Sequence, residues 1–193
     1  MKRTLIGDLP HTIDQTVMIE GWVSVRRDHG KLLFLDIRDR TATVQVVYQV
    51  NESSPADLGE TLKPESVVRI KGIVKQRPER MVNPDMATGT IELGADSIEV
   101  VNSAQTPPFE LHGSENTAGE DIRMQYRYLD LRTERLQHNL RFRHKFIKAL
   151  RDYLDNLGFV EVETPILANS SPEGARDFLV PSRLSEGAFY ALP

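Results

Sequence analysis

The sequence contains no cysteine, and this absence excludes several chemistries at once. Disulfide frameworks, cysteine zinc sites and thiol catalysis all need a residue that the chain lacks. Long hydrophobic runs are also missing: none approaches the ~18 residues of a membrane span. The N-terminal MKRTLIGDLPH has no apolar stretch of the kind found in signal peptides. The sequence therefore predicts a soluble, cytoplasmic protein.

The chain has no large excess of charge of either sign. Its 193 residues include 24 Lys and Arg against 28 Asp and Glu, a net charge of −4. Bulk charge thus gives no indication of nucleic-acid binding, which would need a local basic patch. Phosphate-binding loops, dinucleotide fingerprints, zinc-ligand spacings and nucleophile elbows are absent too, so no metal site is predicted in the chain.

Residues 1–102 are rich in short β-type runs. These lie at 17–23, 32–39, 43–48, 67–74, 90–93 and 97–101, and Gly, Asn, Asp and Pro separate them as turn residues do. One helical turn fits 54–62. The pattern predicts a small Greek-key barrel, for which the OB-fold is the commonest plan, while a β-sandwich with a similar number of strands remains an alternative.

Residues 103–193 have a different character. The stretch 103–132 contains Pro, Gly, Ser and Asn and is predicted to be a hinge or linker. A helix is predicted over 134–157, because apolar residues recur there at three- and four-residue steps, and Gly158 stands where a helix would stop. Strands are predicted at 159–163, ended by Pro165, and from Phe189 onward. The second domain therefore begins in this chain and is incomplete at Pro193.

The first domain carries the residue types that single-stranded RNA recognition needs. These are an aromatic face for stacking, cations for phosphates and polar groups for base edges. The candidates are Arg26, Arg27, Phe34, Gln45, Lys75, Arg77 and Glu92. Taken alone, Phe34 lies in an apolar run and is better interpreted as core, and Arg26 and Arg27 as a solvated turn. His29 is the most notable histidine by position.

The loop at 171–177, SPEGARD, is small, polar and contains glycine. Such a loop can close over a substrate, with Glu173 pairing an amino group and Arg176 a carboxylate or phosphate. Composition alone favours an exposed connection instead.

Several motifs, in order along the chain, resemble those of bacterial-type aspartyl-tRNA synthetases, a class II family. The OB-domain motifs are GWV at 21–23, RRDHG at 26–30, FLDIRD at 34–39 and VQVV at 44–47. QYRYLDLR at 125–132 resembles the end of the hinge, GFVEVETPIL at 158–167 resembles motif 1, and SPEGARDFLVPSR at 171–183 resembles the flipping loop. Lysyl and asparaginyl enzymes share the OB domain and motif 1, but the EGARD run favours the aspartyl branch.

This resemblance implies an all-β OB-fold anticodon-binding domain at 1–102, a hinge at 103–132, and the truncated start of an α+β class II catalytic domain at 133–193. It implies an aspartate–tRNA ligase that uses ATP and Mg²⁺ in its full-length form. Motifs 2 and 3 would lie beyond Pro193. The fragment is therefore expected to have no complete set of catalytic residues, to bind neither cofactor tightly and to be inactive alone. The alternative is a free-standing OB-fold RNA-binding module without ligase activity, and the coding sequence beyond Pro193 distinguishes the two.

The resemblance also implies roles for individual residues. Phe34 would stack on an anticodon base, and Glu173 would close over the ammonium group of aspartate. Pro165 and the motif 1 helix would form a homodimer interface. Contacts to the anticodon bases or their phosphates would come from Arg27, Gln45, Lys75, Arg77 and Glu92.

His29 bears on the choice of tRNA. Family members restricted to the aspartate tRNA tend to have Leu at this position, whereas relatives that also charge the asparagine tRNA tend to have His. Arg77-Pro78-Glu79 also resembles those relatives, although they continue with Gly where this chain has Arg80. The resemblance thus implies an enzyme that reads both anticodons. Because discrimination of a single base contributes only ~1–3 kcal/mol to the binding free energy, one side chain can decide which tRNA is accepted.

Overall fold

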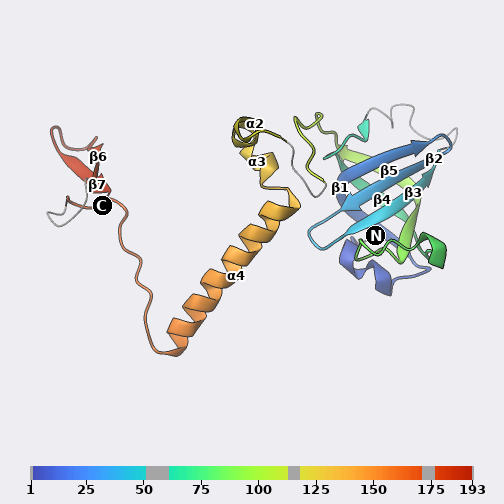
Figure 1. Cartoon of the computed structure of the whole chain (residues 1–193), viewed down its shortest axis with the longest axis horizontal. Coiled ribbons are helices and arrows are strands. Elements are labelled where there is room, and N and C mark those ends of the chain that lie inside the picture. Colours follow the sequence, from blue (N-terminus) through green and yellow to red (C-terminus); the bar gives the residue numbers. More distant parts are fainter. Residues whose placement is uncertain (1, 51–60, 113–117, 171–176, 193) are drawn as a thin grey trace. The chain divides into compact units, whose positions relative to one another are not determined.

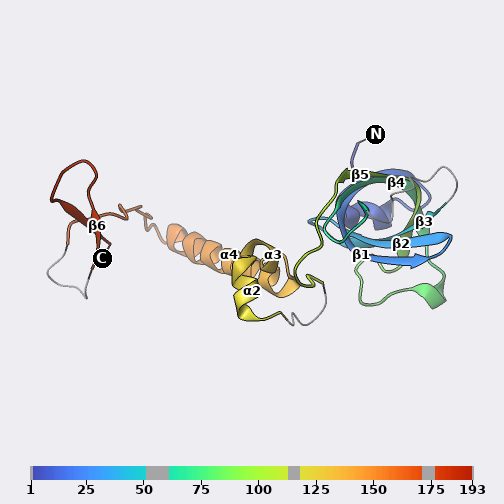
Figure 2. The same cartoon turned by 90° about the horizontal axis from the view of Figure 1, so that it is seen from above.

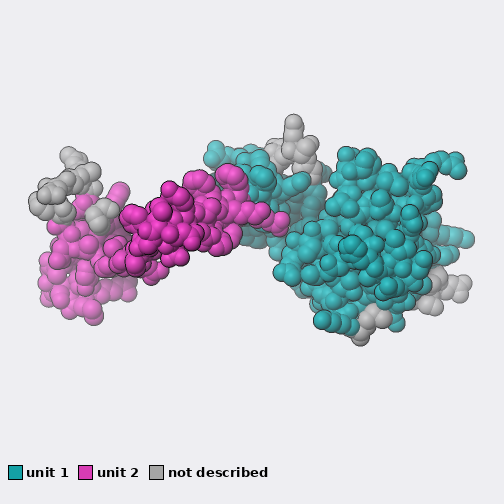
Figure 3. Space-filling view, turned by 90° about the horizontal axis from the view of Figure 1, so that it is seen from below, with its two compact units in different colours: residues 1–139 teal, residues 140–193 magenta. Residues whose placement is uncertain are grey.

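The computed structural model describes residues 2–50, 61–112, 118–170 and 177–192. The chain forms two compact units, residues 1–139 and 140–193 (Figure 3). Within the described residues, no helix is both long and apolar enough to cross a membrane.

Five strands of the first unit close into a barrel (Figure 1). They are β1 (Thr16–His29), β2 (Leu32–Arg38), β3 (Thr43–Gln49), β4 (Val67–Gln76) and β5 (Ile91–Asn102). Their order around the barrel is β1-β2-β3-β5-β4, and β3 pairs with β5 in parallel while the other neighbours are antiparallel. The predicted OB-fold barrel is thereby confirmed. The sandwich alternative is wrong, because one closed sheet replaces two stacked ones.

The pleat of the strands separates an apolar interior from a polar exterior. On β2, Leu33, Leu35 and Ile37 are buried in the core, and alternate residues face outward as strand geometry requires. A short helix, η1 (Ile6–His11), lies at the end of the barrel (Figure 2) and buries Ile6 completely. Asp39 holds this helix, since its Oδ2 accepts a hydrogen bond from the Ile6 amide at 3.0 Å.

Strand β5 is longer than predicted. The sequence suggested two runs, at 90–93 and 97–101, with a turn between them, but the structure has one strand with a register shift opposite Lys71 and Gly72. A bulge explains the difference, because one extra residue bends a strand without ending it. Gly72 permits the close approach there: a Cβ on it would lie 2.2 Å from the Gly94 carbonyl oxygen.

The hinge predicted at 103–132 contains two short helices that the sequence did not indicate, α2 (Glu120–Gln125) and α3 (Arg127–Asp130). A further short helix, η2 (Glu79–Met81), lies between β4 and β5. The helical turn expected at 54–62 falls almost entirely outside the described residues.

Helix α4 (Glu134–Asn156) ends one residue before the predicted boundary, and Gly158 has a φ of 83° as a helix stop requires. The strand predicted at 159–163 is wrong: these residues are irregular and exposed. A strand needs a neighbour to receive its hydrogen bonds, and no described residue pairs with this stretch. Strands β6 (Phe178–Pro181) and β7 (Phe189–Leu192) form an antiparallel pair, which confirms the strand predicted from Phe189.

Candidate nucleic-acid interface

The outer face of the barrel brings together predicted RNA-binding residues from consecutive strands. Arg27 on β1 lies opposite Phe34 on β2, and Phe34 lies opposite Val47 on β3. Gln45 lies two residues before Val47 and opposite Asp36. Because residues at i and i+2 share a face of a strand, these side chains form one continuous outward patch.

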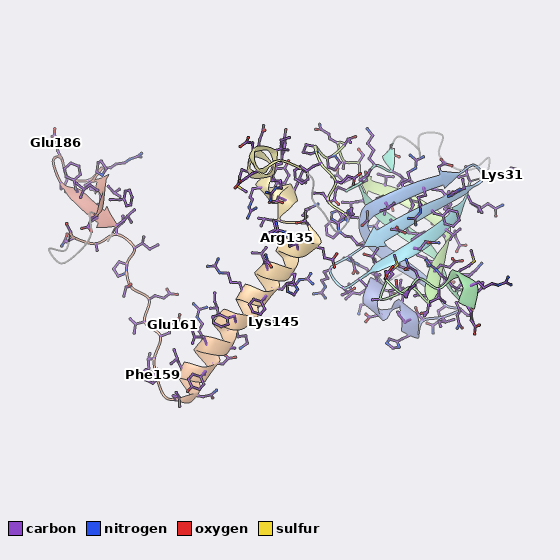
Figure 4. All side chains as sticks on the ribbon, in the orientation of Figure 1. Lys31, Arg135, Lys145, Phe159, Glu161 and Glu186 are labelled. Atoms are coloured by element: carbon purple, nitrogen blue, oxygen red, sulfur yellow. The ribbon has the colours of Figure 1, made fainter. Side chains whose placement is uncertain are left out.

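Phe34 is half-buried and stands outside the core, so its interpretation as a core residue from composition alone is wrong. The pleat decides this, since its neighbours Leu33 and Leu35 occupy the interior. His29 packs edge-on against the Phe34 ring, with ring centroids 5.4 Å apart. Gly30 forms the tip of the β1–β2 hairpin with a φ of 73°, and Lys31 projects from that tip (Figure 4). The hairpin thus offers an aromatic ring in contact with an imidazole, and an exposed lysine at its tip.

Arg27 is held in place by an acidic residue that the sequence analysis did not single out. Its Nη2 donates to Asp36 Oδ1 at 2.9 Å, and Asp36 is only 8% exposed. The guanidinium of Arg27 remains about half exposed, so it is fixed at one edge and open at the other. The sequence signal for Asp36 is its spacing from Phe34, because residues two apart on a strand lie on the same face.

Glu92 sits between two cations at the other side of the patch. Gln45 and Glu92 directly precede Val46 and Leu93, which pair across the parallel strands β3 and β5. Lys75 lies opposite Glu92 and is exposed. The Arg77 side chain is 4% exposed, with its Nε 3.7 Å from Glu92 Oε2 and its Nη1 donating to the Met81 carbonyl at 3.4 Å. Arg77 is therefore turned toward Glu92 rather than toward solvent.

A second polar cluster lies where the hinge meets the barrel, and sequence reasoning missed it. Glu65 accepts two hydrogen bonds from Arg38, at 2.6 and 2.8 Å, and one from Arg132 at 2.5 Å. His112 Nε2 lies 3.3 Å from the same carboxylate. Burial alone would raise the pKa of Glu65, but hydrogen bonds from His112, Arg38 and Arg132 and the charge of Arg38 lower it from 4.5 to about 2. Glu65 is therefore a carboxylate at neutral pH.

Of the two residues assigned roles in the second domain, the structure describes only one. Pro165 is exposed in an irregular stretch, and Glu173 lies outside the described residues. The arrangement on the barrel suits binding rather than bond-making, since it combines an aromatic ring, cations and hydrogen-bonding side chains on one face.

Two family models match the chain. Residues 17–101 match the OB-fold nucleic acid binding domain, and residues 119–193 match the class II tRNA synthetases (D, K and N). Among curated proteins, the aspartate–tRNA(Asp/Asn) ligase of Natranaerobius thermophilus is 48% identical over the whole chain, which covers 33% of that protein. The aspartate–tRNA ligase of Macrococcus caseolyticus is 47% identical over 94% of the chain and 31% of its own length. The chain thus spans about a third of the length of these relatives.

Solved structures show the same fold. Asparaginyl-tRNA synthetase from Pyrococcus horikoshii, complexed with asparaginyl-adenylate, has a TM-score of 0.80 and 26% identity, covering 100% of this chain and 42% of that one. Aspartyl-tRNA synthetase from Entamoeba histolytica has a TM-score of 0.76 and 25% identity over 90% of this chain and 42% of its own. The barrel and the start of the class II catalytic fold are therefore shared with these synthetases.

Proposed function

We propose, from the premise that this chain belongs to the class II aminoacyl-tRNA synthetases in their aspartyl branch, that it is the anticodon-recognising part of an aspartate–tRNA ligase. The observation that carries this proposal is the outward patch of Arg27, Phe34, Gln45 and Glu92 on neighbouring strands. The whole enzyme would join aspartate to tRNA at the expense of ATP.

The anticodon would be held by stacking and by polar contacts. Phe34 would stack on one base, and Arg27, positioned by Asp36, would meet a phosphate. Gln45 and Glu92 would pair with base edges, because amide and carboxylate groups match the donors and acceptors of an unpaired base. Arg77 would orient Glu92 from below the surface, while the exposed Lys75 would contact the RNA backbone.

The proposal is tested by binding of this chain to labelled anticodon stem-loops at one fixed salt concentration, because phosphate contacts make affinity depend on salt. The stem-loops with GUC and GUU should both bind with much higher affinity than the stem-loop with an unrelated triplet. Equal binding of all three would contradict anticodon recognition and leave a general RNA-binding barrel.

We further propose that His29 relaxes the choice between the aspartate and asparagine tRNAs. His29 touches the stacking residue Phe34, so it stands where it can adjust the pocket for a neighbouring base. His29→Leu should raise the preference for GUC over GUU by about 5- to 150-fold, the value of one base contact. Lys31→Ala, which removes a cation from the same hairpin without changing the ring contact, should weaken both stem-loops equally. An unchanged GUC/GUU ratio in His29→Leu would contradict this role.

The remaining assignments concern the full-length enzyme. The proposal includes domain limits at 102 and 132 and a cytoplasmic location. It also includes a homodimer through α4 and Pro165, and closure of Glu173 over the ammonium group of aspartate. ATP and Mg²⁺ would activate the carboxylate of aspartate in that enzyme. The described residues contain no group of three or more His, Asp or Glu that could hold a metal ion. The described residues thus show no such Mg²⁺ site, and no catalytic step is assigned to them.

A further inference from the structure

The turn that leads into β4 receives contacts from three separate points of the hinge. Ser66 Oγ accepts a hydrogen bond from the Ala104 amide at 3.0 Å. The neighbouring Glu65 carboxylate accepts from Arg132 at 2.5 Å and lies 3.3 Å from His112 Nε2. Ala104, His112 and Arg132 span the hinge from its start to its end. Two adjacent residues of this turn therefore hold the hinge at three points.

Glu65 is held in this position by the backbone of β1. Its amide donates to the Val23 carbonyl at 2.8 Å, and the Val23 amide donates to the Ser66 carbonyl at 2.9 Å. The φ of Glu65 is 71°, a conformation that a residue with a side chain adopts only when its surroundings enforce it. The carboxylate is 6% exposed, so its charge depends on the cations around it. A surface ion pair would contribute little in comparison.

Strand β2 links this turn to the RNA-binding patch. Phe34, Asp36 and Arg38 alternate along one face of the strand. Phe34 lies in the patch and Asp36 accepts a hydrogen bond from Arg27 there, whereas both terminal nitrogens of Arg38 donate hydrogen bonds to the Glu65 carboxylate. The side chain of Trp22, which lies opposite Arg38 in the β1–β2 register, is contacted by the guanidinium groups of Arg38 and Arg132, at 5.8 and 5.7 Å from its ring centroid. One face of one strand thus carries the stacking residue at one end and the anchor of the hinge at the other.

We propose that Glu65 is a positioning residue that locks the hinge to the end of β2, so that an RNA held on the Phe34 patch meets the hinge in one fixed orientation. The lock itself is a property of this chain; only its use in RNA binding rests on the proposed function. No contact between Glu65 and RNA is required.

Hydrogen exchange tests the lock without RNA. Glu65→Gln and Arg132→Gln should each accelerate exchange in peptides covering 104–112 and 120–133 by about tenfold, the equivalent of ~1.4 kcal/mol, while β3 keeps its rates. Because both substitutions break the same contact, the double variant should exchange no faster than the faster single variant. Glu20→Gln is the matched control, since the Glu20 carboxylate accepts a hydrogen bond from Arg69 on the barrel surface at 2.7 Å and makes no hydrogen bond or ion pair with the described residues of the hinge. Hinge exchange at the parent rate, additive effects, or equal acceleration throughout the barrel would each overturn the lock.

Binding experiments separate the lock from the proposed function. In Glu65→Gln, affinity for the GUC stem-loop should stay within about threefold of the parent, whereas affinity for the whole aspartate tRNA should fall about tenfold. Equal affinities of parent and variant for both RNAs would overturn the positioning role while leaving anticodon recognition intact. If the parent chain bound neither RNA, the proposed function would fail, and the hydrogen-exchange result would decide on the lock alone.

Discussion

Phe34 turns outward because the pleat of β2 assigns Leu33 and Leu35 to the core. Its ring is supported by His29 from one side and remains half-exposed. An aromatic side chain in this position presents a flat apolar surface at little entropic cost, which is the property that base stacking uses.

Phe34→Leu should weaken binding of the GUC stem-loop by ~1–3 kcal/mol, because leucine keeps the apolar volume but offers no ring for stacking. Fluorescence anisotropy with labelled RNA measures the loss. Tyr153→Leu is the control, since Tyr153 is an exposed aromatic residue on α4 (63% exposed) and its replacement should leave the affinity unchanged. Equal losses in both variants would point to nonspecific aromatic contacts.

Glu65 makes the stability of the first unit depend on pH in the acid range. Its folded pKa of about 2 lies below the ordinary value of 4.5, so the unfolded chain takes up the proton more readily. Its contribution is fully present above pH 4.5 and is lost as the pH falls from 4.5 toward 2. Urea unfolding between pH 2 and pH 6 should therefore show a steeper acid loss in the parent than in Glu65→Gln. Parallel curves for the two proteins would contradict this assignment.

The sequence predicted the side chains of the patch more readily than the residues that hold them in place. Phe34, Gln45 and Glu92 lie on predicted strands, and Arg27 lies in the RRDHG motif, so the resemblance to a known family identifies them directly. Asp36 is found only from the register that sets it beside Arg27. The Glu65 cluster joins residues 38, 65, 112 and 132. These residues are far apart in the sequence and come together only when the barrel closes, so no local sequence pattern predicts the cluster.

At the scale of elements, alternation of apolar and polar residues predicted β2 to β4 well, because each strand has one buried face. The strand predicted at 17–23 was too short: β1 continues to His29 and includes Arg26 and Arg27, which were interpreted as a turn. The sequence predicted two strands in place of β5, because Gly94-Ala95-Asp96-Ser97 has the composition of a turn. Pairing with β4 makes this segment a bulge within one strand. The stretch 159–163 has strand composition but no described partner. Local composition therefore predicts a preference, and the neighbouring strand decides whether it is realised.

Gly72→Ala should destabilise the barrel by ~1–3 kcal/mol, because its Cβ would lie 2.2 Å from the Gly94 carbonyl oxygen and force β4 and β5 apart. Thermal unfolding measures the change. Gly94→Ala is a matched control on the facing strand. Its Cβ would lie 3.4 Å from the flexible Lys75 side chain and 3.7 Å from the Ile73 carbonyl oxygen, an ordinary van der Waals distance, so the melting temperature should hardly change. Equal melting temperatures for the two variants would contradict the importance of the close approach at Gly72.

At the scale of the whole molecule, the two units differ in how they bury apolar surface. The barrel has a continuous core that includes Ile19, Leu35 and Leu93. Helix α4 has no buried residue in the structure described, and Phe146 and Leu150 are 62% and 51% exposed. Exposed apolar surface of this extent is typical of a protein–protein interface. This is consistent with the proposed homodimer, in which a second copy would cover the helix.

Hydrogen exchange of the intact chain at low concentration should reflect this difference. The strands of the barrel should exchange through global unfolding, with the slowest rates in β1 and β4, whereas residues 140–193 should exchange through local opening because little core protects them. Raising the protein concentration should slow exchange in α4 if a second copy covers it. Equally strong protection of both units in the dilute monomer would contradict the prediction.

The position of Trp22 gives the chain an intrinsic optical reporter. It is the single tryptophan among 193 residues, and the guanidinium groups of Arg38 and Arg132 both contact its indole ring. Arg38 belongs to the barrel and Arg132 to the hinge, so release of the hinge removes one cation from the ring and admits water in its place. The fluorescence emission of Trp22 should then shift to longer wavelength. Docking and release of the hinge can thus be followed in real time, without any attached label.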